Sequence, residues 1–122
     1  MKPIYIIDSV IIIEHLNNLP QATQWLIENT KQSHISLVTR MEVLTGYRSL
    51  DAIPIKKFLD RFSMANLSIE VADLTAVLRR EHRWKLPDAI QAGIAQHYNL
   101  KLVTRNTKDF PPDKYPFVLV PY

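Results

Sequence analysis

Short apolar runs alternate with amphipathic helical patterns along this chain, and this alternation restricts the fold more than any other feature. Runs that predict strands lie at residues 4–7, 34–38, 67–71, 100–104 and 117–120. Helical patterns stand between most of them. Strands joined in this way form right-handed crossovers and leave helices on both faces of the sheet. We therefore predict a three-layer α/β/α fold with a mostly parallel sheet of about five strands.

Start signals and apolar spacing predict the helices. Ser9 is expected to cap a helix to about residue 17, although residues 10–13 are apolar enough to continue the first strand instead. Further helices are predicted at about 22–30, 39–50, 55–62, 74–85 and 87–98. Gly46 inside a helix costs about 1 kcal/mol against alanine, so we expect another backbone to approach closely there. Small residues keep the last helix thin enough to lie close to the sheet.

Composition limits the possible chemistry. The 122 residues are enough for one domain, which we expect to span residues 1–122. Absence of cysteine excludes disulfide frameworks, thiolate zinc sites, iron–sulfur clusters and cysteine nucleophiles. The two glycines lie too far apart for a phosphate-binding loop, and the four histidines form no HxH or HExxH pair. A bound metal would need mainly oxygen ligands, which favours Mg²⁺ or Mn²⁺.

Charge and hydropathy bear on location and partners. The net charge of +3 permits a polyanionic partner without requiring one. Asp8 interrupts the first apolar run, which is therefore too short for the core of a signal peptide. No stretch of about 18 apolar residues is present to span a membrane. We expect a soluble, cytoplasmic protein.

Acidic and amide side chains follow several predicted strands. Open parallel sheets bind ligands beyond the carboxyl ends of their strands. Asp8 follows the first strand, Glu42 the second, and Asn106 and Asp109 the fourth. Asp88 opens the helix before the fourth strand, and it reaches the same edge if that helix runs antiparallel to the strands. Four carboxylates from distant segments would then meet.

Such a meeting of carboxylates is costly without a counter-charge. Two carboxylates about 4 Å apart repel by roughly 4 kcal/mol at an effective dielectric near 20. Four of them either raise their pKa values or recruit a divalent cation. Magnesium accepts a few carboxylates and keeps its other positions for water and phosphate oxygens. The pattern is typical of enzymes that transfer phosphoryl groups or cleave phosphodiesters.

Each acid also has a structural interpretation. Glu42 completes Thr39-x-x-Glu42, which is a capping-box pattern. Asp88 at a helix start complements the helix dipole, and Asp109 is a plausible turn residue. Asp8 is harder to explain structurally, because it separates two apolar runs and Ser9 beside it is available for capping.

Basic residues cluster before Asp88. They are read either as a solvated helix end or as a track for RNA phosphates. The candidates are Arg79, Arg80, Arg83 and Lys85, with Arg40, Arg105 and Lys108 elsewhere in the chain. Trp84 among them is read as a packing residue in preference to a base-stacking one. His82 and His97 occupy polar helix positions and are read as surface residues.

Four segments together resemble the PIN-domain family, most closely the VapC-type toxins of bacterial toxin–antitoxin pairs. The segments are residues 6–9 with Glu14, residues 36–46, residues 86–92 and residues 102–110. Their order and spacing cover almost the whole chain, which makes the resemblance more specific than any one segment would be.

The resemblance implies an Mg²⁺- or Mn²⁺-dependent endoribonuclease that leaves a 5′-phosphate on its RNA product. Asp8, Glu42 and Asp88 match the three acids of the family. Asp109 matches a fourth, more variable acid, Asn106 a polar position beside it, and Ser9 the hydroxyl after the first aspartate. A homodimer and a cognate antitoxin are further implications.

Two positions depart from the family pattern. Val10 replaces a small polar residue and Gln91 an apolar one, which puts the metal geometry in question and leaves every carboxylate in place. A non-catalytic module that binds RNA or protein remains the alternative. A phosphoacceptor receiver domain would need paired acids after the first strand and an aspartate after a central one, but Ser9-Val10 follows Asp8 and Thr39-Arg40 follows Val38. A DxD phosphatase would need its second acid at the position of Val10.

Overall fold

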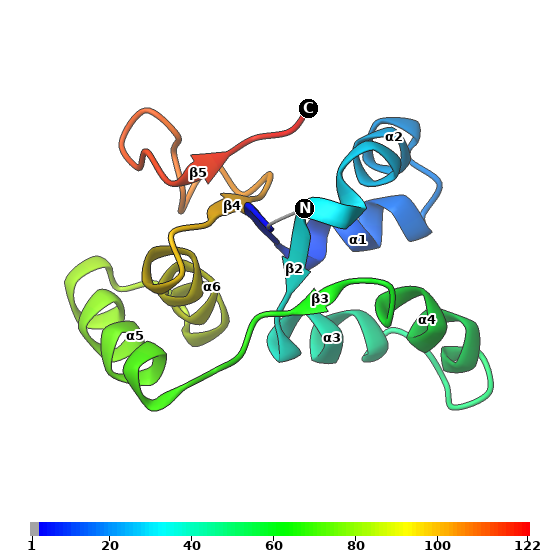
Figure 1. The fold of residues 1–122 in the computed structure, drawn as a ribbon, viewed down its shortest axis with the longest axis horizontal. Coiled ribbons are helices and arrows are strands. Elements are labelled where there is room, and N and C mark those ends of the chain that lie inside the picture. The colour runs from blue at the N-terminus through cyan, green and yellow to red at the C-terminus, as the bar shows by residue number, and fades with distance from the viewer. Residues whose placement is uncertain (1–2) are drawn as a thin grey trace.

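Five short strands form one fully parallel sheet in the computed structural model, which describes residues 3–122. The strands are β1 Tyr5–Ile7, β2 Ser33–Ile35, β3 Ser63–Met64, β4 Lys101–Val103 and β5 Val118–Leu119. Their order in the sheet is β3-β2-β1-β4-β5, and each neighbouring pair is parallel. The predicted parallel α/β fold is confirmed. The central strand β1 lies between β2 and β4, so segments far apart in the chain end side by side (Figure 1).

Helices cover both faces of the sheet (Figure 1). They are α1 Ser9–Leu16, α2 Pro20–Asn29, α3 Leu37–Leu44, α4 Ala52–Leu59, α5 Ile69–His82 and α6 Leu86–His97, with a 3₁₀ turn η1 at Thr30–Gln32. The pair α5 and α6 lies on one face, and the first four helices pack on the other. The helix predicted after Asp8 is confirmed, so residues 10–13 do not extend the first strand.

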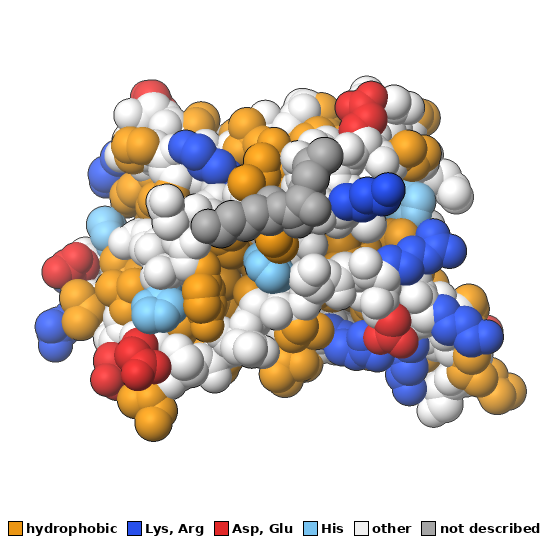
Figure 2. Space-filling model, viewed as in Figure 1, with side chains coloured by type: hydrophobic (Ala, Val, Ile, Leu, Met, Phe, Trp, Pro, Cys, Tyr) orange, Lys and Arg blue, Asp and Glu red, His pale blue; other side chains and the backbone are white. Residues whose placement is uncertain are grey.

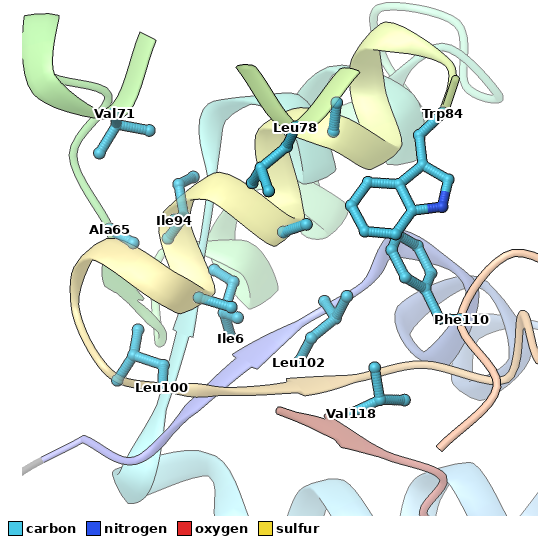
Figure 3. Packing of buried hydrophobic residues seen from close by; sticks show 13 residues of the cluster. Ile6, Ala65, Val71, Leu78, Trp84, Ile94, Leu100, Leu102, Phe110 and Val118 are labelled. Carbon is cyan, nitrogen blue, oxygen red and sulfur yellow. The ribbon is translucent and has the colours of Figure 1, made fainter. Parts of the chain in front are cut away.

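Successive strand residues belong to two separate hydrophobic cores on opposite faces of the sheet. Ile6 and Leu102 point toward α6 and pack with Leu78, Ile94 and other residues of the α5–α6 face (Figure 3). The next residues along the same strands, Ile7 and Val103, belong to the opposite core with α1 to α4. All four strand residues are essentially inaccessible to solvent. Successive side chains of a strand point to opposite faces, so two helix layers are required to bury them.

The strand predicted at residues 67–71 is wrong. Ser68 there is the N-cap of α5, and its Oγ accepts a hydrogen bond from the Val71 N–H at 3.1 Å. The edge strand β3 lies earlier, directly after the buried Phe62. Leu67 and Ile69 are exposed, whereas Val71 is buried as part of α5, so the apolar alternation in this segment does not form one buried face. A serine cap decided the local structure against the strand pattern.

Helix α3 begins earlier than predicted. Ser36 is its N-cap and accepts a hydrogen bond from the Thr39 N–H at 3.2 Å, so the Thr39-x-x-Glu42 capping box does not form. The helix ends at Leu44, and Gly46 lies in the following turn. A Cβ on Gly46 would meet only the Val43 carbonyl at 3.6 Å, an ordinary contact. The expected close approach of another backbone at Gly46 is therefore wrong.

Close packing occurs at the other glycine. A Cβ on Gly93 of α6 would collide with Oγ1 of Thr75 on α5. Both residues are buried, as are Ala92 and Ala95 beside Gly93. The small residues of α6 therefore serve its contact with α5 as well as its contact with the sheet, which was the predicted role.

The surface mixes charged and apolar side chains on the face drawn in Figure 2, with basic side chains most frequent on the side of α4. Within residues 3–122, no helix combines the length and hydrophobicity that a membrane crossing requires.

Candidate active site

Polar residues follow the three central strands at the carboxyl edge of the sheet, and Asp8 among them is a predicted site residue. Asp8 follows β1, Ser36 follows β2 and Thr104 follows β4, and these three strands are neighbours. The Asp8 N–H donates to the Val103 carbonyl at 2.9 Å, which continues the ladder past the last paired residues. The first carboxylate thus stands where the two central strands end.

Asp8 is held by a residue that the sequence interpretation did not single out. Thr104 Oγ1 donates to Asp8 Oδ2 at 2.7 Å. Asp8 occupies the N-cap position of α1, but its side chain makes no capping hydrogen bond there, and Ser9 is the first helical residue. Burial raises the pKa of Asp8, while the interactions with Thr104 and Ser9 lower it by less. A desolvated carboxylate that does not cap its helix favours a functional role.

Glu42 is hydrogen-bonded to Ser9, the residue that follows Asp8. The Ser9 hydroxyl is buried and donates to Glu42 Oε1 at 3.0 Å. Glu42 lies in the second turn of α3, beyond the reach of the helix cap at Ser36. With the capping box absent, its carboxylate is directed toward α1 by this hydrogen bond.

Asp109 and Asn106 form a reciprocal pair in the loop after β4. Asn106 Nδ2 donates to Asp109 Oδ2 at 2.9 Å, and the Asp109 N–H donates back to Asn106 Oδ1 at 3.3 Å. Thr104 Oγ1 accepts the Asn106 N–H at 3.1 Å, so the same hydroxyl contacts this loop and Asp8. The turn interpretation of Asp109 is correct, and the turn also orients its carboxylate.

The pKa of Asp88 is affected by the other three carboxylates. It is half-buried at the third position of α6. Its pKa is raised from 3.8 to about 6, first by burial and then by the negative charges of Asp8, Asp109 and Glu42, with Lys85 opposing. Each of these acids comes from a different segment of the chain. The structure thus brings Asp8, Glu42 and Asp109 within electrostatic range of Asp88.

The chemistry of this cluster suits a hard divalent cation. All its donors are oxygens, and a cation would offset both causes of the raised pKa of Asp88, which are burial and then the nearby negative charges. In the described part of the chain, no three acidic, histidine or cysteine side chains stand close enough to form a metal-binding group as they are. The carboxylates of Asp8, Glu42 and Asp109 therefore act on Asp88 through their charges, but among the described residues the side chains are not close enough to ligate one cation as they stand.

A buried network behind the cluster joins the elements that carry the acids. Gln91 is 2% exposed, and its Oε1 accepts from Ser36 Oγ at 2.8 Å. Its Nε2 donates to Thr39 Oγ1 at 2.7 Å, and that hydroxyl donates to the Ile7 carbonyl at 3.2 Å. The network thus ties α6, α3 and β1. Its sequence signal was a glutamine in a helix stretch otherwise made of small and apolar residues.

The basic residues predicted to bind RNA divide into two groups. Arg40 forms an ion pair with Asp60 at 2.8 Å, and Arg105 forms one with Glu14 at 3.4 Å. These are the two side-chain ion pairs among residues 3–122. The remaining candidates have none there: Arg79, Arg80, Arg83, Lys85 and Lys108.

Two neighbours of the basic cluster were also interpreted from sequence. Trp84 is 6% exposed and packs on Phe110, with ring centroids 4.7 Å apart, which confirms the packing role (Figure 3). His82 is not a simple surface residue. It stacks on Trp84 at 4.2 Å, and its Nδ1 lies 3.2 Å from the Tyr115 hydroxyl.

The family of the chain follows from a profile comparison. The PIN domain profile matches residues 5–111, which contain all four carboxylates. The chain belongs to the PIN-domain family. Among curated relatives of this PIN domain is ribonuclease VapC10 of Mycobacterium tuberculosis, found in strains CDC 1551 and H37Rv. It is 29% identical over 113 residues, which cover 87% of this chain and 85% of the relative.

Solved structures agree with this assignment. A toxin–antitoxin complex from Klebsiella pneumoniae contains a chain that matches this PIN domain with a TM-score of 0.88 and 37% identity, covering 97% of this chain and 98% of that one. A DNA-bound VapBC from Salmonella typhimurium matches with a TM-score of 0.78 at 22% identity, over 89% and 91% of the two chains, and shows the fold alone.

Proposed function

We propose that this PIN domain is a divalent-metal-dependent endoribonuclease and the toxin of a toxin–antitoxin pair. The observation that carries the proposal is the raised pKa of Asp88, which burial and then the charges of Asp8, Asp109 and Glu42 from distant segments produce. Membership of the PIN-domain family and the similarity to a curated ribonuclease support the same reaction class.

The side chains of the site divide into two roles in this proposal, metal binding and orientation of the reacting groups. Asp8, Glu42, Asp88 and Asp109 would hold Mg²⁺ or Mn²⁺. When bound, the cation supplies activation of a water for in-line attack on phosphorus and offsets the charge that develops on the phosphate. Ser9 and Asn106 would orient the water or a phosphate oxygen, in addition to the carboxylates that they contact.

RNA would approach along the basic surface that ends at the carboxylates. The five predicted RNA-binding cations that form no ion pair in the described chain are available to phosphates as they stand. Arg40 and Arg105 would have to exchange their carboxylate partners for phosphate, so we assign them a smaller part in binding.

The partner and location are further parts of the proposal. We infer a cognate antitoxin that covers the four carboxylates, a homodimer and a cytoplasmic location. The match to a chain of the Klebsiella pneumoniae toxin–antitoxin complex at 37% identity supports the antitoxin.

The proposal is tested by incubating the purified protein with single-stranded RNA and Mn²⁺ or Mg²⁺, with EDTA as the matched control. Cleavage that requires the cation and leaves 5′-phosphate ends is the expected result. Intact RNA under all these conditions would contradict it.

A non-catalytic RNA- or protein-binding module is the second candidate. It is favoured by one observation, the absence from residues 3–122 of three acidic or histidine side chains in metal-binding proximity. Titration with Mn²⁺ separates the two functions, since a cation that binds the folded state raises its thermal midpoint. A catalytic site gains stability in this titration, and the module does not.

A further inference from the structure

A pocket of about 220 Å³ opens beside Asp109, at the margin of the four-carboxylate cluster. It lies between the end of α5 and the loop that follows β4. Its walls include His82, Arg83, Trp84, Lys108, Lys114 and Tyr115. Three of these six side chains are cationic, and the pocket shares Asp109 with the candidate active site.

The base of this pocket is already ordered by internal contacts. Trp84 Nε1 donates to the Asp109 carbonyl at 3.1 Å, which fixes the loop to the end of α5. His82 covers one face of the indole at 4.2 Å, with the rings 17° from parallel. The Tyr115 ring packs edge-on to both of them. A nucleobase therefore has no free indole face to stack on, and the pocket offers charge and little aromatic surface.

Positive side chains outnumber negative ones in the lining of this pocket. Arg83, Lys108 and Lys114 are exposed, and none of them forms an ion pair within residues 3–122. The Lys114 ammonium lies 5.3 Å from the centre of the Tyr115 ring. The single carboxylate of the pocket, on Asp109, accepts a hydrogen bond from Asn106. The three positive charges against one carboxylate leave a surplus of positive charge around the cavity, which favours the entry of an anion.

The backbone of Arg83 is a second observation at the same place. Arg83 has φ 59° and ψ 27° in the left-handed region, at the position that ends α5. Glycine is the usual residue in this conformation because it lacks a Cβ. An arginine here is strained, and it sets a guanidinium between this pocket and a neighbouring one of about 470 Å³ lined by Arg79 and Arg80. Strain at such a point is typical of functional positions.

We propose that the pocket beside Asp109 binds a backbone phosphate of RNA that flanks the scissile phosphate. The inference rests on the proposed ribonuclease function and adds a specific anchor for its substrate. A phosphate fits because the lining is cationic and the cavity is small. Contact with Asp109 would place this anchor next to the cleavage site, and the arginines at the end of α5 continue the track away from it.

The test measures RNA binding without cleavage. In an Asp8→Asn background, the affinity for a short fluorescent single-stranded RNA is followed as the salt concentration rises. Each phosphate neutralised contributes about 0.7 to the slope of log affinity against log salt. The double variant Lys108→Gln/Lys114→Gln is expected to lose about 0.7 of that slope, which corresponds to one phosphate. The matched control Lys56→Gln/Lys57→Gln, which removes two exposed lysines of α4, is expected to keep it.

Arg83→Gly separates binding from folding. Glycine accepts the left-handed backbone, so we expect an unchanged thermal midpoint together with weaker RNA binding and a lower salt slope. RNA binding as tight as that of the parent would overturn the proposal. An equal loss of slope in the α4 control would also overturn it, because the effect would then be one of diffuse charge. An unchanged slope in the pocket variant would likewise overturn it.

The binding assay also keeps this inference distinct from the proposed function. If the wild-type protein cleaves no RNA with any divalent cation but the pocket variant loses its slope, the ribonuclease assignment fails and the phosphate pocket stands. If the wild-type protein cleaves RNA and the pocket variant binds like its parent, the pocket fails and the ribonuclease stands.

Discussion

Thr104 donates a 2.7 Å hydrogen bond to Asp8 although the two residues are 96 positions apart in the chain. They meet because β1 and β4 are neighbours in the sheet, so their carboxyl ends lie together. The threonine hydroxyl stabilises the charged form of a carboxylate whose burial favours the neutral one. This contact keeps the first acid of the candidate site ready to accept a cation.

Thr104→Val should weaken the site without unfolding the protein. A hydrogen bond to a charged group contributes about 1.5–3 kcal/mol, so Mn²⁺ affinity is expected to fall by roughly one to two orders of magnitude. Mn²⁺ binding followed by electron paramagnetic resonance measures this loss. Thr107→Val, at an exposed position of the same loop, is the control and should bind Mn²⁺ like the wild type.

Asp8→Asn should abolish RNA cleavage and leave the protein folded. The amide has the size of the carboxylate and lacks its charge, and the native carboxylate is already raised in pKa by burial. The thermal midpoint without metal is therefore expected to stay the same or rise. Gel assays with Mn²⁺ and circular dichroism check the two halves. Metal-dependent cleavage by the pure variant would refute the assigned role.

Stability without metal should fall as the pH rises from about 4 to about 6. The pKa of Asp88 is raised from 3.8 to about 6 in the folded protein, so the folded state retains a proton that the unfolded state has lost. The stabilisation is complete below pH 3.8 and is lost as the pH passes about 6. The raised pKa of Asp8 acts in the same direction. Urea unfolding in EDTA measures the slope, and Asp88→Asn should flatten it.

Gln91→Leu should destabilise the protein by about 1–3 kcal/mol, because the change leaves the buried Ser36 and Thr39 hydroxyls without their amide partner. Chemical denaturation gives the free energy of unfolding. Gln96→Leu on the exposed side of α6 is the matched control and should cost little. Equal effects at the two positions would show that the network contributes nothing specific.

Gly93→Ala should destabilise the α5–α6 contact by about 1–3 kcal/mol, since the added methyl group meets Thr75 Oγ1. The Thr75 hydroxyl is buried and has no hydrogen-bond partner among the described residues, so its removal leaves no partner unsatisfied. The double variant Thr75→Ala/Gly93→Ala is therefore expected to recover most of the loss. Thermal denaturation of the single and double variants checks this recovery.

Local patterns failed where two signals of similar strength competed. Residues 67–71 alternate in hydrophobicity like a strand, but Ser68 caps a helix, and burial of the long α5 against α6 decided the outcome. Thr39-x-x-Glu42 matches a capping box, but Ser36 three residues earlier is the cap. In both cases a serine directly before the first helical residue outweighed the competing pattern.

The amino-acid sequence by itself determined the alternation of strands and helices, the oxygen-only chemistry and the four acids that end separate segments. These follow from side-chain types and their spacing, which are local properties. Only the tertiary structure decided that Thr104 supports Asp8, that Gln91 joins three elements, and that Arg40 and Arg105 are paired. Such contacts depend on the strand order β2-β1-β4 and on how the helices pack across it, and no spacing within a single segment specifies either.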